Sequence, residues 1–189
     1  MSVKKIVIFA SGGGSNAEKI MEHFALSSEV QVAKIICNNP SAGVISKAKL
    51  FDVPVALISN EDAKNGNVLT TLCSDADLIV LAGYLRKIPS DFIAGLEERI
   101  VNLHPSLLPK YGGKGMFGAH VHEAVLANNE KETGITIHYV NENFDEGRII
   151  AQFRTKLTND DTLSSVQKKI QFLEHSYFPV VIDTVLKSK

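Results

Sequence analysis

Apolar runs rich in β-branched residues recur through the first part of the chain, and segments with helical spacing lie between them. The apolar runs are Lys5–Ala10, Val30–Cys37, Pro54–Ile58, Leu78–Ala82 and Ile100–His104. The helical segments are Asn16–Phe24, Ala42–Phe51, Val68–Cys73 and Pro89–Glu97. Strands that alternate with helices predict a parallel sheet with helices on both faces. Continuous apolar runs such as IVIFA and LIVLA are typical of strands that are buried on both sides.

The second half of the chain has a different order of elements. A helix is predicted from Ala119, in AHVHEAVLAN, and two alternating strands follow at Gly134–Val140 and Arg148–Leu157. Only the turn-rich segment NENFDEG separates these strands, which favours an antiparallel pair at one end of the sheet. A long helix from Leu163 to about residue 185 closes the chain, with a kink expected at Pro179. The predicted fold is therefore α/β and Rossmann-like, with a mostly parallel sheet and an antiparallel strand pair near the C-terminus.

Composition narrows the class of protein. The 189 residues are 44% hydrophobic, enough for one domain with a sizeable core, and no repeat or linker divides residues 1–189. A net charge of −1 gives no electrostatic sign of nucleic acid or of an anionic membrane as a partner. No apolar run approaches the ~20 residues of a membrane span, and the first run is too short for a signal peptide. We expect a cytoplasmic protein in which Cys37 and Cys73 are reduced and structural.

Three consecutive glycines separate the first predicted strand from the first predicted helix, in SGGGSN at residues 11–16. Glycines permit a tight turn and expose consecutive N–H groups, and the helix N-terminus adds partial positive charge. We expect the loop to bind a phosphate through its backbone, the Ser15 hydroxyl and the Asn16 amide. The alternative is that Ser15 or Asn16 merely caps the helix.

The same loop satisfies the dinucleotide-binding pattern G-x-G-x-x-A through Gly12, Gly14 and Ala17. The second predicted strand, however, ends in CNN at residues 37–39, where a dinucleotide-binding fold usually has Asp or Glu for the ribose hydroxyls. The loop also lacks the Lys-Ser/Thr ending of a P-loop. A phosphate monoester on a small sugar is the better expectation.

The fifth predicted strand ends in a histidine that proline follows at once, in VNLHPSLLPKYGG at residues 101–113. Asn102 and His104 alternate, so their side chains leave the same face of the strand. Because Pro105 cannot continue a central strand, His104 lies at the carboxyl edge, where open α/β sheets bind ligands. An amide and an imidazole there can hydrogen-bond an oxygen that gains negative charge during a reaction. A satisfied core histidine is the alternative.

An acidic candidate for the same edge is Asp145, in the turn FDEGR. An ordinary turn residue is the alternative, but a turn folded over the edge would bring its carboxylate to His104, directly or through a water. Such a carboxylate would raise the pKa of the imidazole and favour its cationic form. His138 is expected to be a core or supporting group. His120 and His122, two residues apart, do not share a helix face, which argues against a metal site built on both.

Two further segments contribute candidates. The segment LAGYLRKI, Leu81–Ile88, ends the fourth predicted strand and can form an apolar wall with one Arg for a flat heterocycle, although core packing explains it equally well. Glu174 and His175 fall within the terminal helix, where a solvated surface position is the default expectation.

Together, SGGGSN, LAGYLRKI, VNLHPSLLPKYGG and FDEG, in this order over essentially the whole chain, resemble the phosphoribosylglycinamide formyltransferases. NLHPSLLP is specific to formyltransferases as a class, and SGGGSN selects the phosphoribosyl substrate within it. The resemblance implies a single formyltransferase domain that passes a formyl group from 10-formyltetrahydrofolate to the amine of glycinamide ribonucleotide, without a metal ion. It implies small-molecule substrates and a monomer or homodimer.

The resemblance also implies roles for individual residues. Catalysis falls to Asn102 as oxyanion partner, His104 as proton donor and Asp145 as the group that raises the histidine pKa. Ribonucleotide binding falls to Gly14, Ser15, Asn16 and Glu174. Folate binding falls to Lys64, Leu85, Arg86, Lys87, Ile88, Asn102, Asn141, Glu142, Asn143 and Phe144. Lys64 is the nearest match to a basic folate contact, in a segment, EDAKNGN, that departs from the family pattern. The long loop Gly112–Ala119 is expected to act as a flexible flap.

Two other functions fit part of these observations. A related enzyme could deliver the formyl group to water or to charged tRNA, although such proteins usually carry an additional domain. A non-catalytic Rossmann-like module that binds a phosphorylated sugar or nucleotide would explain SGGGSN and the sheet. It would not explain the presence of Asn102, His104 and Asp145.

Overall fold

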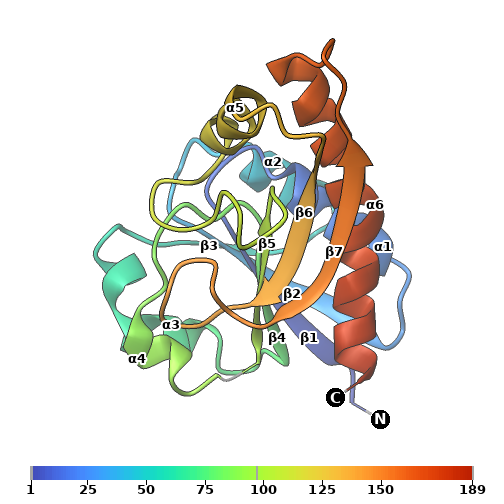
Figure 1. The fold of residues 1–189 in the computed structure, drawn as a ribbon. Helices are drawn as coiled ribbons and strands as arrows, with labels where there is room; N and C mark the ends of the chain where they lie inside the picture. Colours follow the sequence, from blue (N-terminus) through green and yellow to red (C-terminus); the bar gives the residue numbers. More distant parts are fainter. Residues whose placement is uncertain (1, 97, 189) are drawn as a thin grey trace.

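The predicted alternation of strands and helices forms a seven-stranded sheet (Figure 1). The computed structural model describes residues 2–96 and 98–188. The first five strands are β1 (Lys4–Ala10), β2 (Val30–Cys37), β3 (Val55–Leu57), β4 (Leu78–Leu81) and β5 (Ile100–His104). They pair in parallel, and each lies within about one residue of an apolar run in the sequence.

Five short helical elements connect or follow these strands. They are α1 (Ser15–Phe24), α2 (Val44–Leu50), the 3-10 turn η1 (Asp62–Lys64), α3 (Gly66–Leu72) and α4 (Ser90–Ile93). Helix α3 begins two residues earlier than predicted because the Asn65 side chain accepts hydrogen bonds from the backbone N–H groups of Asn67 and Val68. Helix α4 is shorter than the predicted 89–97, since Gly95 disfavours helix, and the predicted end at Glu97 lies outside the described residues.

The C-terminal elements are α5 (Ala119–Ala127), β6 (Glu132–Tyr139), β7 (Ile149–Lys156) and α6 (Leu163–Lys187). Strands β6 and β7 form the predicted antiparallel pair, and β6 also pairs antiparallel with β5. Thr162 is the N-cap residue of α6 and forms a capping box with Ser165. Pro179 lies inside α6 without ending it.

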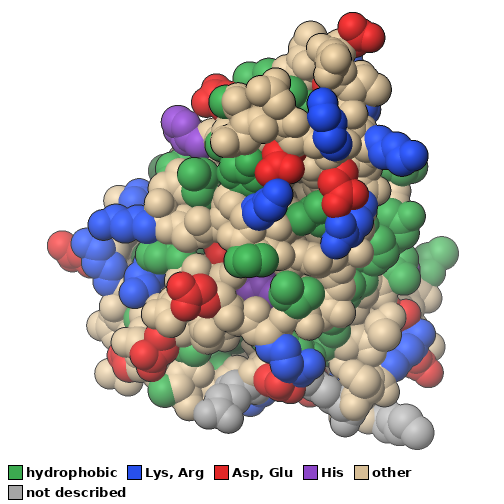
Figure 2. Space-filling view, in the orientation of Figure 1, with side chains coloured by type: hydrophobic (Ala, Val, Ile, Leu, Met, Phe, Trp, Pro, Cys, Tyr) green, Lys and Arg blue, Asp and Glu red, His purple; other side chains and the backbone are tan. Residues whose placement is uncertain are grey.

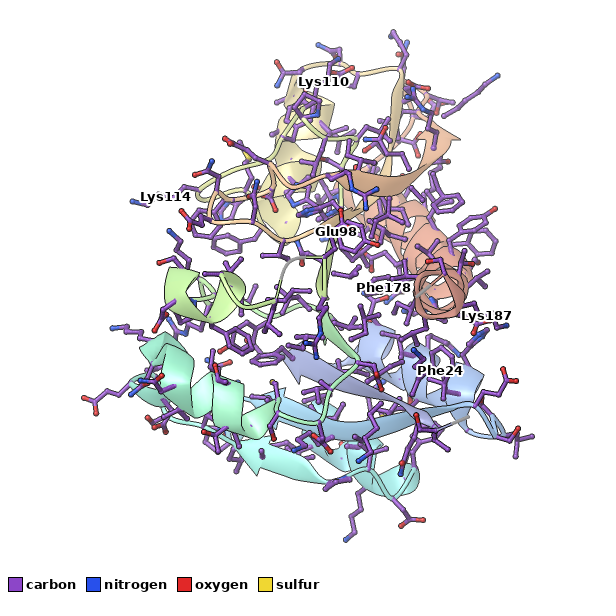
Figure 3. The ribbon with its side chains drawn as sticks, turned by 90° about the horizontal axis from the view of Figure 1, so that it is seen from below. Phe24, Glu98, Lys110, Lys114, Phe178 and Lys187 are labelled. Atoms are coloured by element: carbon purple, nitrogen blue, oxygen red, sulfur yellow. The ribbon has the colours of Figure 1, made fainter. Side chains whose placement is uncertain are left out.

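Helices cover both faces of the sheet, as the buried strand pattern requires (Figure 3). On one face Ile6, Ile8 and Ala10 of β1 pack with α1, α2 and α6. On the other face Val7 and Phe9 pack with α3 and α4. A third cluster joins α5, β6, β7 and the start of α6. All the β1 residues named here are fully buried, which confirms that this strand is covered on both sides.

The strand order is β3-β2-β1-β4-β5-β6-β7, so the chain reverses its direction of growth between β1 and β4. Ligands of open α/β sheets bind beyond the carboxyl ends of the strands at such a switch point. The glycine loop follows β1, the segment LAGYLRKI starts at the last residue of β4 and continues into the following loop, and His104 ends β5. The fold therefore places three of the four sequence motifs at one edge of the sheet.

Candidate active site

A cleft of about 520 Å³ lies along this carboxyl edge. The loops after β1, β4 and β5 border it, together with the loop between β6 and β7 and residues from α5 and α6. The predicted residues that line it are Asn16, Leu85, Arg86, Lys87, Ile88, Asn102, His104, Asn141, Glu142, Asn143, Phe144, Asp145 and Glu174. Figure 2 shows one face of the molecule. Lys and Arg side chains lie along the left side of that face, and a histidine is visible between the surface side chains near its centre.

The glycine loop leaves the N-terminus of α1 without a side-chain cap. Gly14 is the N-cap residue, with a left-handed backbone (φ 72°), and Ser15 and Asn16 already belong to the first turn. Neither of them caps the helix, so the simpler alternative for this loop is wrong. The first N–H groups of a helix have no intrahelical acceptor, and they combine with the dipole to attract an anion. Asn16 lines the cleft, and Gly14 and Ser15 immediately precede it.

The shape of this loop depends on close packing against the next helix. The N–H of Val44 donates to the carbonyl of Gly12, and Gly43 packs against the Gly13 backbone. A Cβ atom at Gly14 would come within 2.6 Å of the Val44 side chain. Ser11 ties the loop to its neighbours, because its hydroxyl donates to Asn38 and accepts from the N–H of Leu85.

Glu174 lies in the cleft and not on the solvated surface of α6, so the default expectation for this residue is wrong. The Asn16 amide donates to the Glu174 carboxylate at 2.9 Å, although the two residues are 158 positions apart. Burial raises the pKa of Glu174, and the hydrogen bond from Asn16 opposes that shift. The other side-chain atom of Asn16, Oδ1, is buried without a hydrogen-bond partner among the described residues. The pair therefore offers an acceptor to a hydroxyl or amine of a ligand.

The predicted catalytic residues come together from two segments, strand β5 and the loop between β6 and β7. His104 Nδ1 lies 3.4 Å from a carboxylate oxygen of Asp145. The Asn102 amide donates to His138 Nε2 at 3.1 Å, because His138 Nδ1 donates to the carbonyl of Tyr139. His138 Nε2 also lies 3.7 Å from Asp145. His138 is therefore a supporting group, as expected, and it orients Asn102.

Burial outweighs the carboxylate in setting the charge of His104. The side chain is 3% exposed, and burial lowers the pKa of His104 below its ordinary value, although Asp145 and the Tyr111 carbonyl both act to raise it. The expectation that Asp145 makes this histidine cationic in the free protein is therefore wrong, because the net shift of the His104 pKa is downward. Asp145 does act to raise this pKa, and that part of the expectation is confirmed. His104 is mainly neutral near pH 7 when no ligand is present.

Asp145 remains ionised in spite of its burial. Burial acts to raise the pKa of Asp145, but hydrogen bonds and charge from His138, His104 and the N–H of Gly113 outweigh it and lower the net value. The Gly113 N–H donates to Asp145 at 2.9 Å. The cleft thus holds a carboxylate that is ready to stabilise positive charge on the imidazole beside it.

The side of the cleft that follows β4 has the apolar wall and the basic residue that the sequence suggested. Ile88 is buried, Leu85 is exposed at 60%, and Arg86 lies between them in sequence. Lys87 lies over the ring of Phe144, with 5.5 Å from Nζ to the ring centre, so this contact links the loop after β4 to the loop between β6 and β7.

Several residues lie where the sequence could not place them. Lys64 is exposed in η1 and does not line the cleft.

His120 is exposed, whereas His122 lines the cleft and is 6% exposed, which confirms that the two do not share a helix face. Burial and the nearby His104 lower the pKa of His122. In the sequence, the only indication that His122 lies at the cleft was its position in the first turn of the helix that follows the loop Gly112–Ala119. That loop lines the cleft from Gly113 to Gly118, and its motion stays a prediction.

Cys37 and Cys73 are buried and unlinked, and burial raises the pKa of Cys73 to about 12. Within residues 2–96 and 98–188, no helix is both long and apolar enough to cross a membrane. The described part of the chain also contains no group of three or more His, Cys, Asp or Glu side chains that could hold a metal ion.

The sheet, the glycine loop and the polar cleft define an α/β protein with a cleft at the switch point of its sheet, the place where open α/β sheets bind ligands. A family model described as "Formyl transferase" matches residues 4–182. The chain belongs to the formyl transferase family.

Individual relatives are similar over most of the chain. It is 35% identical to a phosphoribosylglycinamide formyltransferase of Bacillus subtilis, covering 97% of this chain and 95% of the relative. It is 34% identical to a chloroplastic phosphoribosylglycinamide formyltransferase of Arabidopsis thaliana, covering 98% of this chain but only 66% of the plant protein. A crystal structure of the Bacillus halodurans phosphoribosylglycinamide formyltransferase superposes with a TM-score of 0.87 at 35% identity, covering 97% and 95% of the two chains.

Proposed function

We propose that this protein transfers the formyl group of 10-formyltetrahydrofolate to the amine of glycinamide ribonucleotide, a step of purine synthesis. The observation that carries the proposal is the convergence of Asn102, His104 and Asp145 beside a free helix N-terminus in one cleft. A family of formyl transferases and relatives of this name support the choice of reaction. A pocket with a phosphate site at one end and an apolar wall at the other suits two substrates of these kinds.

The ribonucleotide is assigned to the α1 side of the cleft. Backbone N–H groups of Gly14, Ser15 and Asn16 would bind its phosphate. The Asn16–Glu174 pair would accept hydrogen bonds from its ribose hydroxyls, which also gives the buried Asn16 Oδ1 a partner. The folate is assigned to Leu85–Ile88 and to the backbone of residues 141–145, with Lys64 as a distant candidate that only a large movement could bring into contact.

His104 and Asn102 act on the formyl oxygen. The neutral amine attacks the formyl carbon, and negative charge develops on that oxygen. In its cationic form His104 donates an N–H to it, and the second N–H of the Asn102 amide does the same, since the first is bonded to His138. Developing negative charge raises the proton affinity of His104 and so offsets the effect of burial.

Asp145 supports the proton transfers that complete the reaction. Its carboxylate stabilises the imidazolium, and it can hold a water that takes a proton from the attacking amine and delivers one to the departing folate nitrogen. The formyl group is already activated on the folate, so the proposed steps use protein side chains and need no metal ion. We expect the reaction to take place in the cytoplasm, by a monomer or a homodimer.

The test mixes the purified protein with 10-formyltetrahydrofolate, with and without glycinamide ribonucleotide, and follows both folate species. Loss of formyl-folate that depends on the acceptor supports the transferase. Loss without the acceptor would establish a hydrolase in its place. No turnover together with ribonucleotide binding would establish a non-catalytic binding module.

A further inference from the structure

Both ring nitrogens of His104 face hydrogen-bond acceptors. Nε2 lies 2.7 Å from the backbone carbonyl of Tyr111, and Nδ1 lies 3.4 Å from Asp145. A carbonyl oxygen can only accept, so the short contact requires a proton on Nε2. The Asp145 contact is longer, and the same carboxylate oxygen already accepts from the N–H of Gly113. In the neutral imidazole the proton therefore resides on Nε2, and Nδ1 carries the lone pair.

The carbonyl that selects this tautomer is held in place from outside the cleft. The Tyr111 hydroxyl donates to Glu130 at 2.9 Å, and Lys110 donates to the same carboxylate oxygen at 2.8 Å. The Ser106 hydroxyl donates to the Lys110 carbonyl at 2.6 Å. Tyr111 itself has a left-handed backbone (φ 57°), a conformation that a residue with a bulky side chain adopts only when its surroundings impose it. Figure 3 labels Lys110 and Lys114, between which this segment passes.

We propose that Tyr111 and Glu130 are positioning residues: Glu130 anchors the Tyr111 side chain, and the Tyr111 carbonyl then holds Nε2–H of His104, which makes Nδ1 the reacting nitrogen. Neither residue was among the sequence candidates. The anchor lies on the short segment between α5 and β6, on the far side of Tyr111 from the cleft.

This inference deepens the proposed function and rests on it for its catalytic meaning. In the imidazolium both nitrogens carry protons. When the Nδ1–H bond breaks, the proton passes to the oxyanion, and it returns to Nδ1 as the carbonyl reforms and the folate nitrogen leaves. Between these two transfers the electron pair stays on Nδ1 and leaves the neutral Nε2–H tautomer. That product is the tautomer which the Tyr111 carbonyl stabilises, so His104 does not need to rotate during turnover.

The direct test is nitrogen NMR of the full-length, ligand-free protein labelled with ¹⁵N-histidine, with His104 assigned by comparison with His104→Asn. The ring nitrogen shifts distinguish a nitrogen that carries a proton from one that carries a lone pair. We expect Nε2–H above the titration of His104 in the wild type. We expect a mixture of tautomers in Tyr111→Phe and in Glu130→Ala. Glu130→Gln, which keeps an acceptor for Tyr111, should restore the wild-type spectrum.

The matched control is Glu132→Ala. Glu132 is exposed, lies two residues beyond Glu130 and pairs with Arg154 instead of with Tyr111. Its His104 spectrum should equal that of the wild type. A wild-type protein with the proton on Nδ1, or unchanged tautomers in folded Tyr111→Phe and Glu130→Ala, would overturn the proposal. Because this readout needs no substrate, it is independent of whether the formyl transfer itself is confirmed.

Kinetics supply a second readout. Tyr111→Phe and Glu130→Ala should lower kcat roughly fivefold, the value of one ordinary hydrogen bond, with KM for either substrate changed by less than about twofold. The pH dependence of kcat should also shift, because the Tyr111 carbonyl raises the pKa of His104. The other groups that act on this histidine are Asp145, His138 and His122, and none of the variants replaces them. A loss of stability without a change in the pH profile would reduce Glu130 to a structural role.

Discussion

The two ends of the cleft are built in opposite ways. The glycine loop is contiguous in sequence, and its shape depends on backbone conformation and on the contact with Val44. The cluster of Asn102, His104 and Asp145 comes from segments more than forty residues apart and depends on side-chain charges in a buried place. The difference teaches that one end is sensitive to volume and the other to charge. Substitutions chosen for each property should affect one end and spare the other.

The most severe test of this separation is His104→Ala. It removes a hydrogen-bond donor to the developing oxyanion, and the loss of one such donor costs roughly a hundredfold or more in rate. Ribonucleotide affinity should stay close to that of the wild type, because the shape of the loop after β1 depends on Val44 and Gly43, whereas the imidazole contacts Tyr111. Steady-state kinetics and calorimetric titration with the ribonucleotide measure the two effects. A parallel collapse of affinity would show that the two ends are not independent.

Asp145→Asn should have the next largest effect, again confined to the charged end. The carboxylate raises the pKa of His104 against the effect of burial, so its removal lowers that pKa further. The cationic histidine then exists only at more acidic pH, and the decline of kcat on the alkaline side should begin at a lower pH. We expect kcat to fall about tenfold or more at pH 7.

The control for this variant is Glu146→Gln, in the adjacent position. Glu146 is exposed and accepts a hydrogen bond from Asn143, which Gln can also do. Its pH profile should match that of the wild type. An Asp145→Asn profile that keeps the wild-type midpoint would contradict the assigned electrostatic role.

The glycine loop is tested by comparing Gly14→Ala with Gly12→Ala. At Gly14 a methyl group meets Val44 at 2.6 Å on a left-handed backbone, whereas at Gly12 it meets no described atom within 4 Å. Gly14→Ala should lower the free energy of unfolding by about 1–2 kcal/mol, and Gly12→Ala by less than about 0.5 kcal/mol. Gly14→Ala should also weaken ribonucleotide binding while the folate KM is unchanged. Urea unfolding and titration measure both; equal stability of the two variants would contradict the packing argument.

What the sequence predicted well depends on local pattern. The runs that became β1 and β4 are apolar enough to require burial on both faces, and the order of strands and helices then determines where Asn16, Asn102 and His104 lie. Turn chemistry also placed Asp145 near the edge. The pairing of β6 with β5 followed no local signal, because register and neighbour depend on the whole sheet.

What the sequence could not predict is the balance of burial and charge. The expected approach of Asp145 suggested a cationic histidine, but the pKa of His104 depends more on how deeply the folded chain buries the ring, which no spacing reveals. The same reason explains Glu174: a helix position between Leu173 and His175 gives no sign that Asn16 lies opposite. Tyr111 acts through its backbone carbonyl, a role that residue type does not show.

The smallest predicted effect lies at Glu174, which accepts a hydrogen bond from Asn16 beside the glycine loop. Its folded pKa is raised, so its favourable contribution to folding is complete below the unfolded value near 4.5 and is lost as pH rises through the folded value.

At pH 7 the ionised side chain therefore costs stability, and Glu174→Gln should stabilise the protein by about 0.5–1 kcal/mol, a modest gain because this half-buried group keeps part of its hydration. The gain should vanish near pH 4, while ribonucleotide affinity falls at pH 7, where Gln is a weaker acceptor than the ionised carboxylate. Chemical unfolding at the two pH values, with the exposed Glu29→Gln as control, separates this charge effect from packing. A stability difference that is equal at both pH values would show that volume, and not charge, matters at this position, and Glu174 would then belong with the glycine loop.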